Sequence, residues 1–176
     1  MPPIPGSSRI SESSDGAGPA LSFAIAPARG AAEIETVRAL FGEYRAYLGP
    51  NMQLPGYDEE MAGLPGDYAP PSGEILLARD GDGAALGCAV LRALAVGAGE
   101  IKRLYVREAA RGMGLGRALT LEIEAIARRA GYRELKLDSL PRLVAAISLY
   151  RSLGFADVPR YNDNPNPGVV FMGKRL

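Results

Sequence analysis

The sequence predicts one α+β domain organised around a mixed β-sheet. Segments with strand-like and helical hydrophobic patterns follow one another in the order β-α-(α)-β-β-β-α-β-α-β-β. Three consecutive strands indicate an antiparallel meander, whereas the later strand-helix-strand unit indicates a parallel crossover. The length of 176 residues and the hydrophobic content of 47% suit a single buried core.

The N-terminal part of the chain sets the start of this domain. Residues 1–19 are rich in Pro, Gly and Ser and have hardly any large apolar side chains, so we expect a disordered leader. The domain then spans residues 20–176. Alternating apolar residues predict a first strand at 21–25, and apolar residues at helical spacing predict a helix at 31–48. A short helix flanked by loops is expected at 57–64.

The central and C-terminal segments complete the pattern. Two Asp-Gly steps at 80–83 are typical of a hairpin turn and join two of the expected strands. The elements expected in this part of the chain are strands at 74–79, 84–94 and 100–106, a helix at 115–130, a strand at 134–138, a helix at 142–153, and closing strands at 155–159 and 169–174.

The composition excludes several classes of function. Lys+Arg and Asp+Glu both count 20, so no basic excess exists to neutralise a nucleic acid, and we expect no nucleic-acid partner. No apolar run approaches the roughly 20 residues that cross a bilayer, so we expect no membrane partner and a cytoplasmic location. Histidine is absent, which excludes Ser-His-Asp and Cys-His catalysis and removes most transition-metal sites, so we expect no metal. The single cysteine, Cys88, lies in an apolar run and is interpreted as a core thiol.

The most informative motif is the run Arg-Gly-Met-Gly-Leu-Gly-Arg at 111–117, between an expected strand and an expected helix. Glycines leave the backbone N–H groups of a turn uncovered, and the following helix adds its unpaired first-turn donors and the positive end of its dipole. The sequence therefore predicts a cradle for a diphosphate. Two other interpretations stay open: a tight strand-to-helix connection, and a dinucleotide-binding turn begun by Gly112 and Gly114. Arg117 fits the latter poorly, because that turn needs a third glycine at this position for close packing.

Three stretches of the sequence together resemble a known family. They are the Arg-x-x-Gly-x-Gly turn at 111–116, the Lys-Arg-Leu-Tyr-Val segment at 102–106, and the Ala-Ile-Ser-Leu-Tyr-Arg-Ser-Leu-Gly-Phe segment at 146–155. They resemble the GNAT N-acetyltransferase superfamily, most strongly over residues 73–176. Glu43-Tyr44 and the segment at 64–71 are similar to a prokaryotic branch of uncharacterised members.

This resemblance implies a fold, a co-substrate and a set of binding residues. The fold is a GNAT-like, mixed and mostly antiparallel sheet of about six to seven strands with helices on both faces. The co-substrate is acetyl-CoA, whose pyrophosphate binds the backbone N–H groups of the glycine turn and whose pantetheine arm binds the main chain of the strand before it. The residues implied in cofactor binding are Leu104, Tyr105, Val106, Arg111, Gly112, Met113, Gly114, Leu115, Gly116 and Arg117.

The same resemblance implies roles for three further residues. Tyr150 matches the tyrosine that donates a hydrogen bond to the departing thiolate; a helix tyrosine half buried against the sheet is the alternative. Glu100 matches the position of a general base, often acting through water, and a surface glutamate at a strand edge is the alternative. Tyr161 precedes the last strand, where members build part of the acceptor pocket, unless this segment is an ordinary Asn/Pro turn.

Two features near the last helix bear on the site. Leu143 stands where many members of the superfamily have an asparagine that touches the coenzyme, so a polar contact is lost. Asp138 and Ser139 are interpreted as a helix-start signal ahead of Pro141.

We therefore expect an enzyme that moves an acetyl group from acetyl-CoA to a primary amine of a small molecule or peptide, by direct attack in a ternary complex. No covalent intermediate is expected, since nothing near Cys88 in the sequence activates its thiol. The alternative is a non-catalytic acyl-CoA sensor or interaction module with the same fold, and a nucleotide-binding oxidoreductase is a more distant one. Homodimers are common among similar proteins, so a homodimer stays open.

Overall fold

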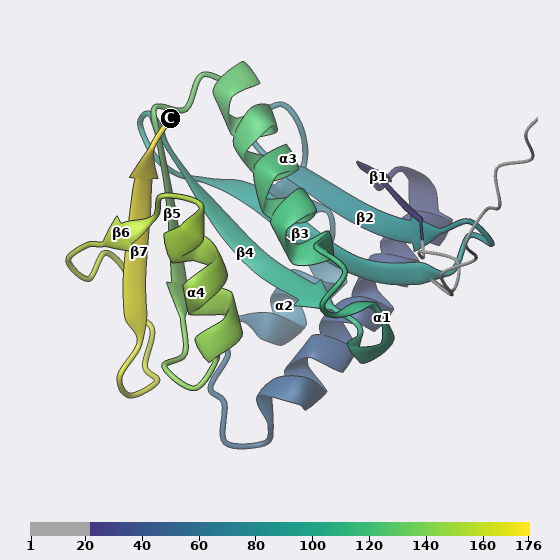
Figure 1. Cartoon of the computed structure of the whole chain (residues 1–176), viewed down its shortest axis with the longest axis horizontal. Coiled ribbons are helices and arrows are strands. Elements are labelled where there is room, and N and C mark those ends of the chain that lie inside the picture. Colours follow the sequence, from purple (N-terminus) through teal and green to yellow (C-terminus); the bar gives the residue numbers. More distant parts are fainter. Residues whose placement is uncertain (1–21) are drawn as a thin grey trace, which may run out of the picture.

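A computed structural model describes residues 22–176, so the expected leader at 1–19 and the first two residues of the expected domain lie outside the described part. Seven strands form one sheet in the order β1-β2-β3-β4-β5-β7-β6 (Figure 1). The elements are β1 (Phe23–Pro27), α1 (Gly30–Leu48), α2 (Tyr57–Gly63), β2 (Glu74–Asp80), β3 (Ala85–Ala95), β4 (Ala98–Val106), α3 (Leu115–Arg129), β5 (Glu134–Ser139), α4 (Val144–Ser152), β6 (Ala156–Asp157) and β7 (Val170–Arg175), with short 3-10 helices at Gly66–Tyr68 and Glu108–Ala110. The predicted order of helices and strands and the mixed sheet are confirmed.

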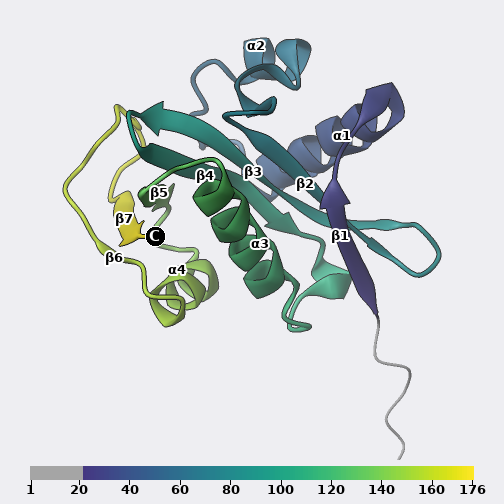
Figure 2. The same ribbon diagram turned by 90° about the horizontal axis from the view of Figure 1, so that it is seen from above.

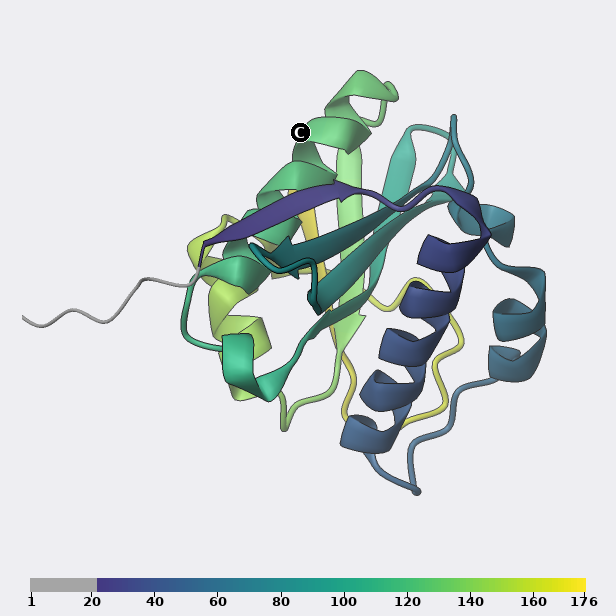
Figure 3. The ribbon, with the colours of Figure 1, turned by 90° about the vertical axis from the view of Figure 1, so that its right-hand side faces the viewer.

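The helices lie on both faces of the sheet, as the sequence led us to expect. Helices α3 and α4 cover one face, and α1 and α2 cover the other (Figures 2 and 3). Strands β1 to β4 form an antiparallel meander, and β4 pairs with β5 in parallel after the crossover through α3. No helix in the described range is long and apolar enough to cross a bilayer.

The sheet separates two apolar cores. On one face, α3 buries Leu119, Ile123 and Ala127, whose spacing of four residues places them on one side of the helix against the sheet. On the other face, α1 buries Phe41 in a core that also contains Cys88. The predicted core thiol is confirmed, and burial raises the pKa of Cys88 to about 12, so the group remains a neutral thiol.

Strand β4 carries a β-bulge in its second half. Cys88 pairs with Tyr105 and Val90 pairs with Lys102, so two residue steps on β3 are matched by three on β4. Arg103 lies at this bulge with a φ of 54°, a left-handed conformation that a residue with a side chain seldom adopts. Such a conformation costs on the order of 1–3 kcal/mol and persists only where surrounding contacts hold it.

An ion pair with α2 holds the bulge in place. The guanidinium of Arg103 donates to both carboxylate oxygens of Glu60, at 3.0 and 2.5 Å, and the hydroxyl of Tyr68 donates to the same carboxylate at 2.6 Å. Burial favours the neutral form of Glu60, but the hydrogen bonds and charge of Arg103 outweigh it and hold the pKa of this carboxyl below its usual value of 4.5. The pair therefore ties α2 to the strand at the bulge.

Replacing Glu60 with Gln should lower the free energy of unfolding at pH 7 by about 3 kcal/mol, because the buried Arg103 would lose its counter-charge. A carboxyl whose pKa is lower in the folded than in the unfolded chain stabilises the fold above its unfolded pKa, and this contribution is lost as the pH falls through the folded value. Urea denaturation should therefore show a smaller loss of stability below pH 4.5 in Glu60→Gln than in the wild type.

The matched control is Glu59→Gln, since Glu59 lies beside Glu60 on α2 and is exposed. This change should alter the free energy of unfolding by less than about 0.5 kcal/mol. Equal losses in the two variants would contradict the role given to the ion pair.

Candidate active site

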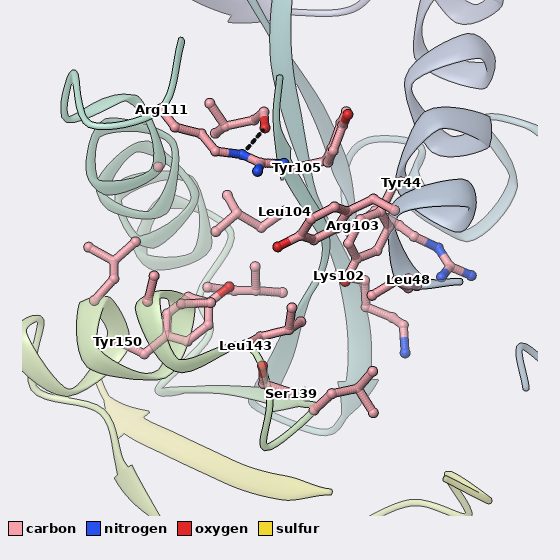
Figure 4. A pocket seen from close by; sticks show the side chains of 18 of the residues that line it. Tyr44, Leu48, Lys102, Arg103, Leu104, Tyr105, Arg111, Ser139, Leu143 and Tyr150 are labelled. Carbon is pink, nitrogen blue, oxygen red and sulfur yellow. Dashed lines mark hydrogen bonds between the residues drawn. The ribbon is translucent and has the colours of Figure 1, made fainter. Parts of the chain in front are cut away.

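A cavity of about 570 Å³ opens where β4 and β5 part. The two strands pair over only three residues, ending with Glu100 opposite Lys136, and beyond this point the edge of β4 that faces β5 has no strand partner. The cavity is lined by residues 101–106 of β4, by the glycine turn and the start of α3, by the end of β5 and the start of α4, and by Tyr44, Tyr47, Leu48, Met52 and Leu54 from α1 and the loop after it (Figure 4). The site is therefore built from both faces of the sheet.

The glycine turn presents a row of unpaired backbone donors to this cavity. Within the described chain, none of the backbone N–H groups of residues 112–117 donates a hydrogen bond to another protein atom, and the first helical bond runs from Ala118 to Gly114. Gly112 and Gly114 have φ angles of 77° and 79°, and a Cβ atom added to either would meet no atom within 4 Å. The glycines thus serve the left-handed turn and leave open space beside the donors.

The charge around the cavity suits a polyanion. Five cationic side chains and one carboxylate line it: Lys102, Arg103, Arg111, Arg117, Arg142 and Asp138. The Nε of Arg111 donates to the carbonyl oxygen of Val106 at 3.1 Å, drawn as a dashed line in Figure 4, and its guanidinium lies 4.6 Å from the ring centroid of Tyr47. Unpaired amides at a helix start, together with nearby arginines, form a fitting site for a diphosphate.

The structure brings nearly all the residues implied in cofactor binding to this cavity. Of the ten, nine line it; Met113 instead packs its side chain against the core beneath α3, although its N–H belongs to the unpaired row. Leu143 also lines the cavity, at the position where the sequence departs from the wider superfamily. A diphosphate cradle needs open space and unpaired donors at the turn, whereas a simple strand-to-helix connection needs neither. This turn has both features, which favours the cradle.

Tyr150 reaches into the cavity from α4, across from Tyr44 of α1 (Figure 4). Only 6% of the residue is exposed, and its ring meets that of Phe155 edge to face at 5.8 Å between centroids. No buried side-chain oxygen or nitrogen in the described chain lacks a partner, and no partner is seen for this hydroxyl, so it must lie at the accessible surface of the cavity. Burial raises the pKa of Tyr150 well above 10.0, which keeps the phenol protonated.

Glu100 and Tyr161 contact each other, but neither lines the cavity. The hydroxyl of Tyr161 donates to Glu100 at 2.9 Å, and Arg92 donates to the same carboxylate at 2.7 Å. Glu100 is 0% exposed, so the alternative of a surface glutamate is wrong. Burial raises the pKa of Tyr161, and the Glu100 charge raises it further. Because neither residue lines the cavity, their roles as general base and acceptor-side residue stay predictions.

The helix-start interpretation of Asp138 and Ser139 is wrong. Helix α4 begins at Val144 with Leu143 as the preceding residue, and no side chain caps it. The Oδ2 atom of Asp138 instead accepts hydrogen bonds from the side-chain amides of Asn162 and Asn164, at 2.7 and 3.1 Å. These contacts place the carboxylate at the wall of the cavity.

Sequence reasoning missed the wall that α1 contributes. Tyr44, Tyr47 and Leu48 are spaced three and four residues apart, so they share one side of the helix, and the sequence offered this spacing as the only signal. The same pattern also fits a helix face buried in a core. Among residues 22–176, no cluster of three or more His, Cys, Asp or Glu side chains is arranged to hold a metal ion.

Comparison with known proteins places these features in a family. Residues 37–155 match the acetyltransferase (GNAT) family. An uncharacterised N-acetyltransferase of Schizosaccharomyces pombe is 38% identical over 141 residues, covering 80% of this chain and 86% of that protein. An IAA acetyltransferase of Azospirillum brasilense is 38% identical over 144 residues, covering 81% of this chain and 92% of that protein. The expected prokaryotic branch is not confirmed, because a relative this similar comes from fission yeast.

Solved structures agree with this placement. A Klebsiella pneumoniae protein provisionally described as an acyl-CoA N-acyltransferase has a TM-score of 0.65 and 29% identity, and the match covers 88% of this chain and 97% of that one. The fold is also shared with an N-acetyltransferase of Thermoplasma acidophilum in complex with coenzyme A, at a TM-score of 0.67 and 19% identity over 89% of this chain and 100% of that one. The chain belongs to the acetyltransferase (GNAT) family and is an acyl-CoA-dependent acetyltransferase.

Proposed function

We propose that the enzyme transfers an acetyl group from acetyl-CoA to a primary amine by direct attack within a ternary complex. The observation that carries this proposal is the row of unpaired donors at 112–117, which opens into the same cavity as the hydroxyl of Tyr150. A binding turn and a proton donor in one cavity allow both substrates to meet without a covalent enzyme intermediate. Cys88 lies outside the cavity lining and keeps its proton, which argues against an acetyl-cysteine intermediate.

One set of residues would bind acetyl-CoA, and Tyr150 would supply a proton. Amides 112–117, with Arg111 and Arg117 beside them, would hold the diphosphate, and the unpaired edge of β4 at 101–106 would hold the pantetheine arm. When bound, acetyl-CoA supplies an activated acetyl group as a thioester. The C–N bond would form as the C–S bond of the thioester breaks, and Tyr150 would donate its phenolic proton to the departing sulfur. The amine nitrogen would release one proton to solvent before the attack and return a second to the tyrosinate as the amide forms.

The alternative of an acyl-CoA sensor that binds without turnover is disfavoured by the family to which the chain belongs, although Leu143 on the cavity wall stands where the sequence departs from many members of the superfamily. The two functions differ in one product. An enzyme releases free thiol from acetyl-CoA when a suitable amine is added, whereas a sensor shows saturable binding with no thiol.

Acetyl-CoA at about 100 times its Kd should stabilise the protein by about 2.7 kcal/mol, which corresponds to a rise in Tm of about 5–10 °C for a chain of this size. Gly114→Glu should abolish the rise, since its backbone φ of 79° disfavours any side chain and its carboxylate would repel the diphosphate. Gly131→Glu is the matched control, because Gly131 has a φ of 86° with open space at its Cβ but lies beyond the far end of α3. A rise in Tm in Gly114→Glu as large as that of the wild type would contradict the proposal.

Tyr150→Phe should lower kcat about 100-fold while leaving the acetyl-CoA thermal shift intact, because it removes only the proton donor. Since the pKa of Tyr150 is raised above 10.0, this group stays protonated, so the wild-type rate should not fall on its account as the pH rises to 10. Steady-state kinetics from pH 6 to 10, with Tyr132→Phe outside the cavity as control, provide the measurement. An unchanged kcat in Tyr150→Phe would rule out the assigned role.

A further inference from the structure

We propose that the acceptor is a monoamine with an apolar, aromatic body, and that Asp138 binds its ammonium group. This inference rests on the proposed function and names the acceptor class for the same cavity. It follows from one carboxylate, one apolar wall and the balance of charge around them.

Asp138 is held in a fixed orientation with one oxygen left for a ligand. Its Oδ2 accepts the amides of Asn162 and Asn164 from the loop before β7. Its Oδ1 has no hydrogen-bond partner in the described chain, and no Lys or Arg there forms a salt bridge with this carboxylate. Because Asp138 lines the cavity, the remaining oxygen is available to a cation that enters it.

The carboxylate lines the same cavity as Tyr150, the residue assigned to the departing sulfur. After burial and the influence of Tyr44, the negative charge of Asp138 contributes to the raised pKa of Tyr150, and it raises the pKa of Tyr44 as well. All three residues line the same cavity, from β5, α4 and α1. An ammonium bound at Asp138 would share this cavity with the phenol assigned to the departing sulfur, and it would release one proton to solvent before its nitrogen attacks the thioester.

An apolar wall stands on the α1 side of the same cavity. Tyr44, Leu48, Met52 and Leu54 line it together with two further tyrosines, and the Tyr105 ring lies 5.7 Å from that of Tyr44 and 6.3 Å from that of Tyr47. Tyr47 keeps 46% of its surface exposed at this wall. Tilted tyrosine rings and aliphatic side chains bind an aromatic or aliphatic body through burial and ring contacts.

The balance of charge selects against acceptors with several ammonium groups. Asp138 is the single carboxylate among the described lining residues. Of the five cations there, Lys102 and Arg103 are already paired with Glu100 and Glu60, which lie outside the lining, whereas Arg142 forms no salt bridge in the described chain. A second ammonium on a polyamine or an aminoglycoside would enter this cavity without a counter-charge and beside like charges. A monoamine avoids this repulsion and places its apolar remainder on the tyrosine wall.

Thiol release from acetyl-CoA should be compared for 2-phenylethylamine, spermidine and kanamycin. The expected kcat/KM is at least 10-fold higher for 2-phenylethylamine than for the two polycations. Asp138→Asn should lower kcat/KM for 2-phenylethylamine about 100-fold, because the ammonium loses its charged partner. Asp163→Asn makes the same change at an exposed position between Asn162 and Asn164, in the loop before β7, and should have the wild-type value.

A binding measurement separates a direct contact from a structural role. Calorimetry on the protein loaded with coenzyme A should show that the wild type binds 2-phenylethylamine more tightly than 2-phenylethanol, which has no charge. Asp138→Asn should lose this preference and bind both alike, while its thermal shift with coenzyme A shows that it is folded.

A preference for the amine that persists in Asp138→Asn, or a higher kcat/KM for spermidine or kanamycin, would overturn the inference. The binding arm needs no turnover, so its outcome is distinct from that of the proposed function. If thiol release were absent with every amine, the transfer reaction would be refuted, and the dependence of 2-phenylethylamine binding on Asp138 would still decide the ammonium site.

Discussion

The short parallel pairing of β4 with β5 is the constraint on which the site depends. Three residue pairs join the strands, and past Glu100 the two diverge, which leaves one edge of β4 without a partner inside the protein. The bulge at Arg103 falls in this unpaired half, and a bulge bends a strand and increases its twist. The guanidinium of Arg103 is bound by Glu60, so helix α2 is tied to β4 at the bulge, beside the cavity that is lined from both faces.

The chemistry of the cavity follows from which polar groups the fold leaves unpaired. The amides of 112–117 have no acceptor in the described chain, so an anion bound in the cavity would satisfy them. Three carboxylates elsewhere are paired with arginines: Glu60 with Arg103, Glu43 with Arg107, and Glu100 with Arg92. Asp138 differs from these three because amides, not cations, bind it. The cavity therefore has an anion-binding end at the amides of 112–117 and, elsewhere in its lining, the single carboxylate of Asp138.

Local patterns in the sequence were sufficient for the element order, the sheet class and the glycine turn. Periodicity reports which face of each element is buried, and the turn depends on neighbouring residues alone. The cavity wall on α1 could not be predicted in the same way, since Tyr44 and Asp138 come to line one cavity only through the packing of α1 and β5. An apolar helix face looks the same in the sequence whether it lines a core or a cavity. The burial of Glu100 depends on Arg92 and Tyr161, which the sequence does not place beside it. The amide partners of Asp138 follow it by 24 and 26 residues, so local sequence could not reveal them.

Hydrogen exchange of individual backbone amides, followed by NMR, tests the central claim most directly. In the free protein, the amides of 112–117 should exchange rapidly because they are unpaired, and coenzyme A should slow their exchange while leaving the turn at Gly131 unchanged. Protection of these six amides before any ligand is added, or unchanged exchange at saturating coenzyme A, would contradict the account.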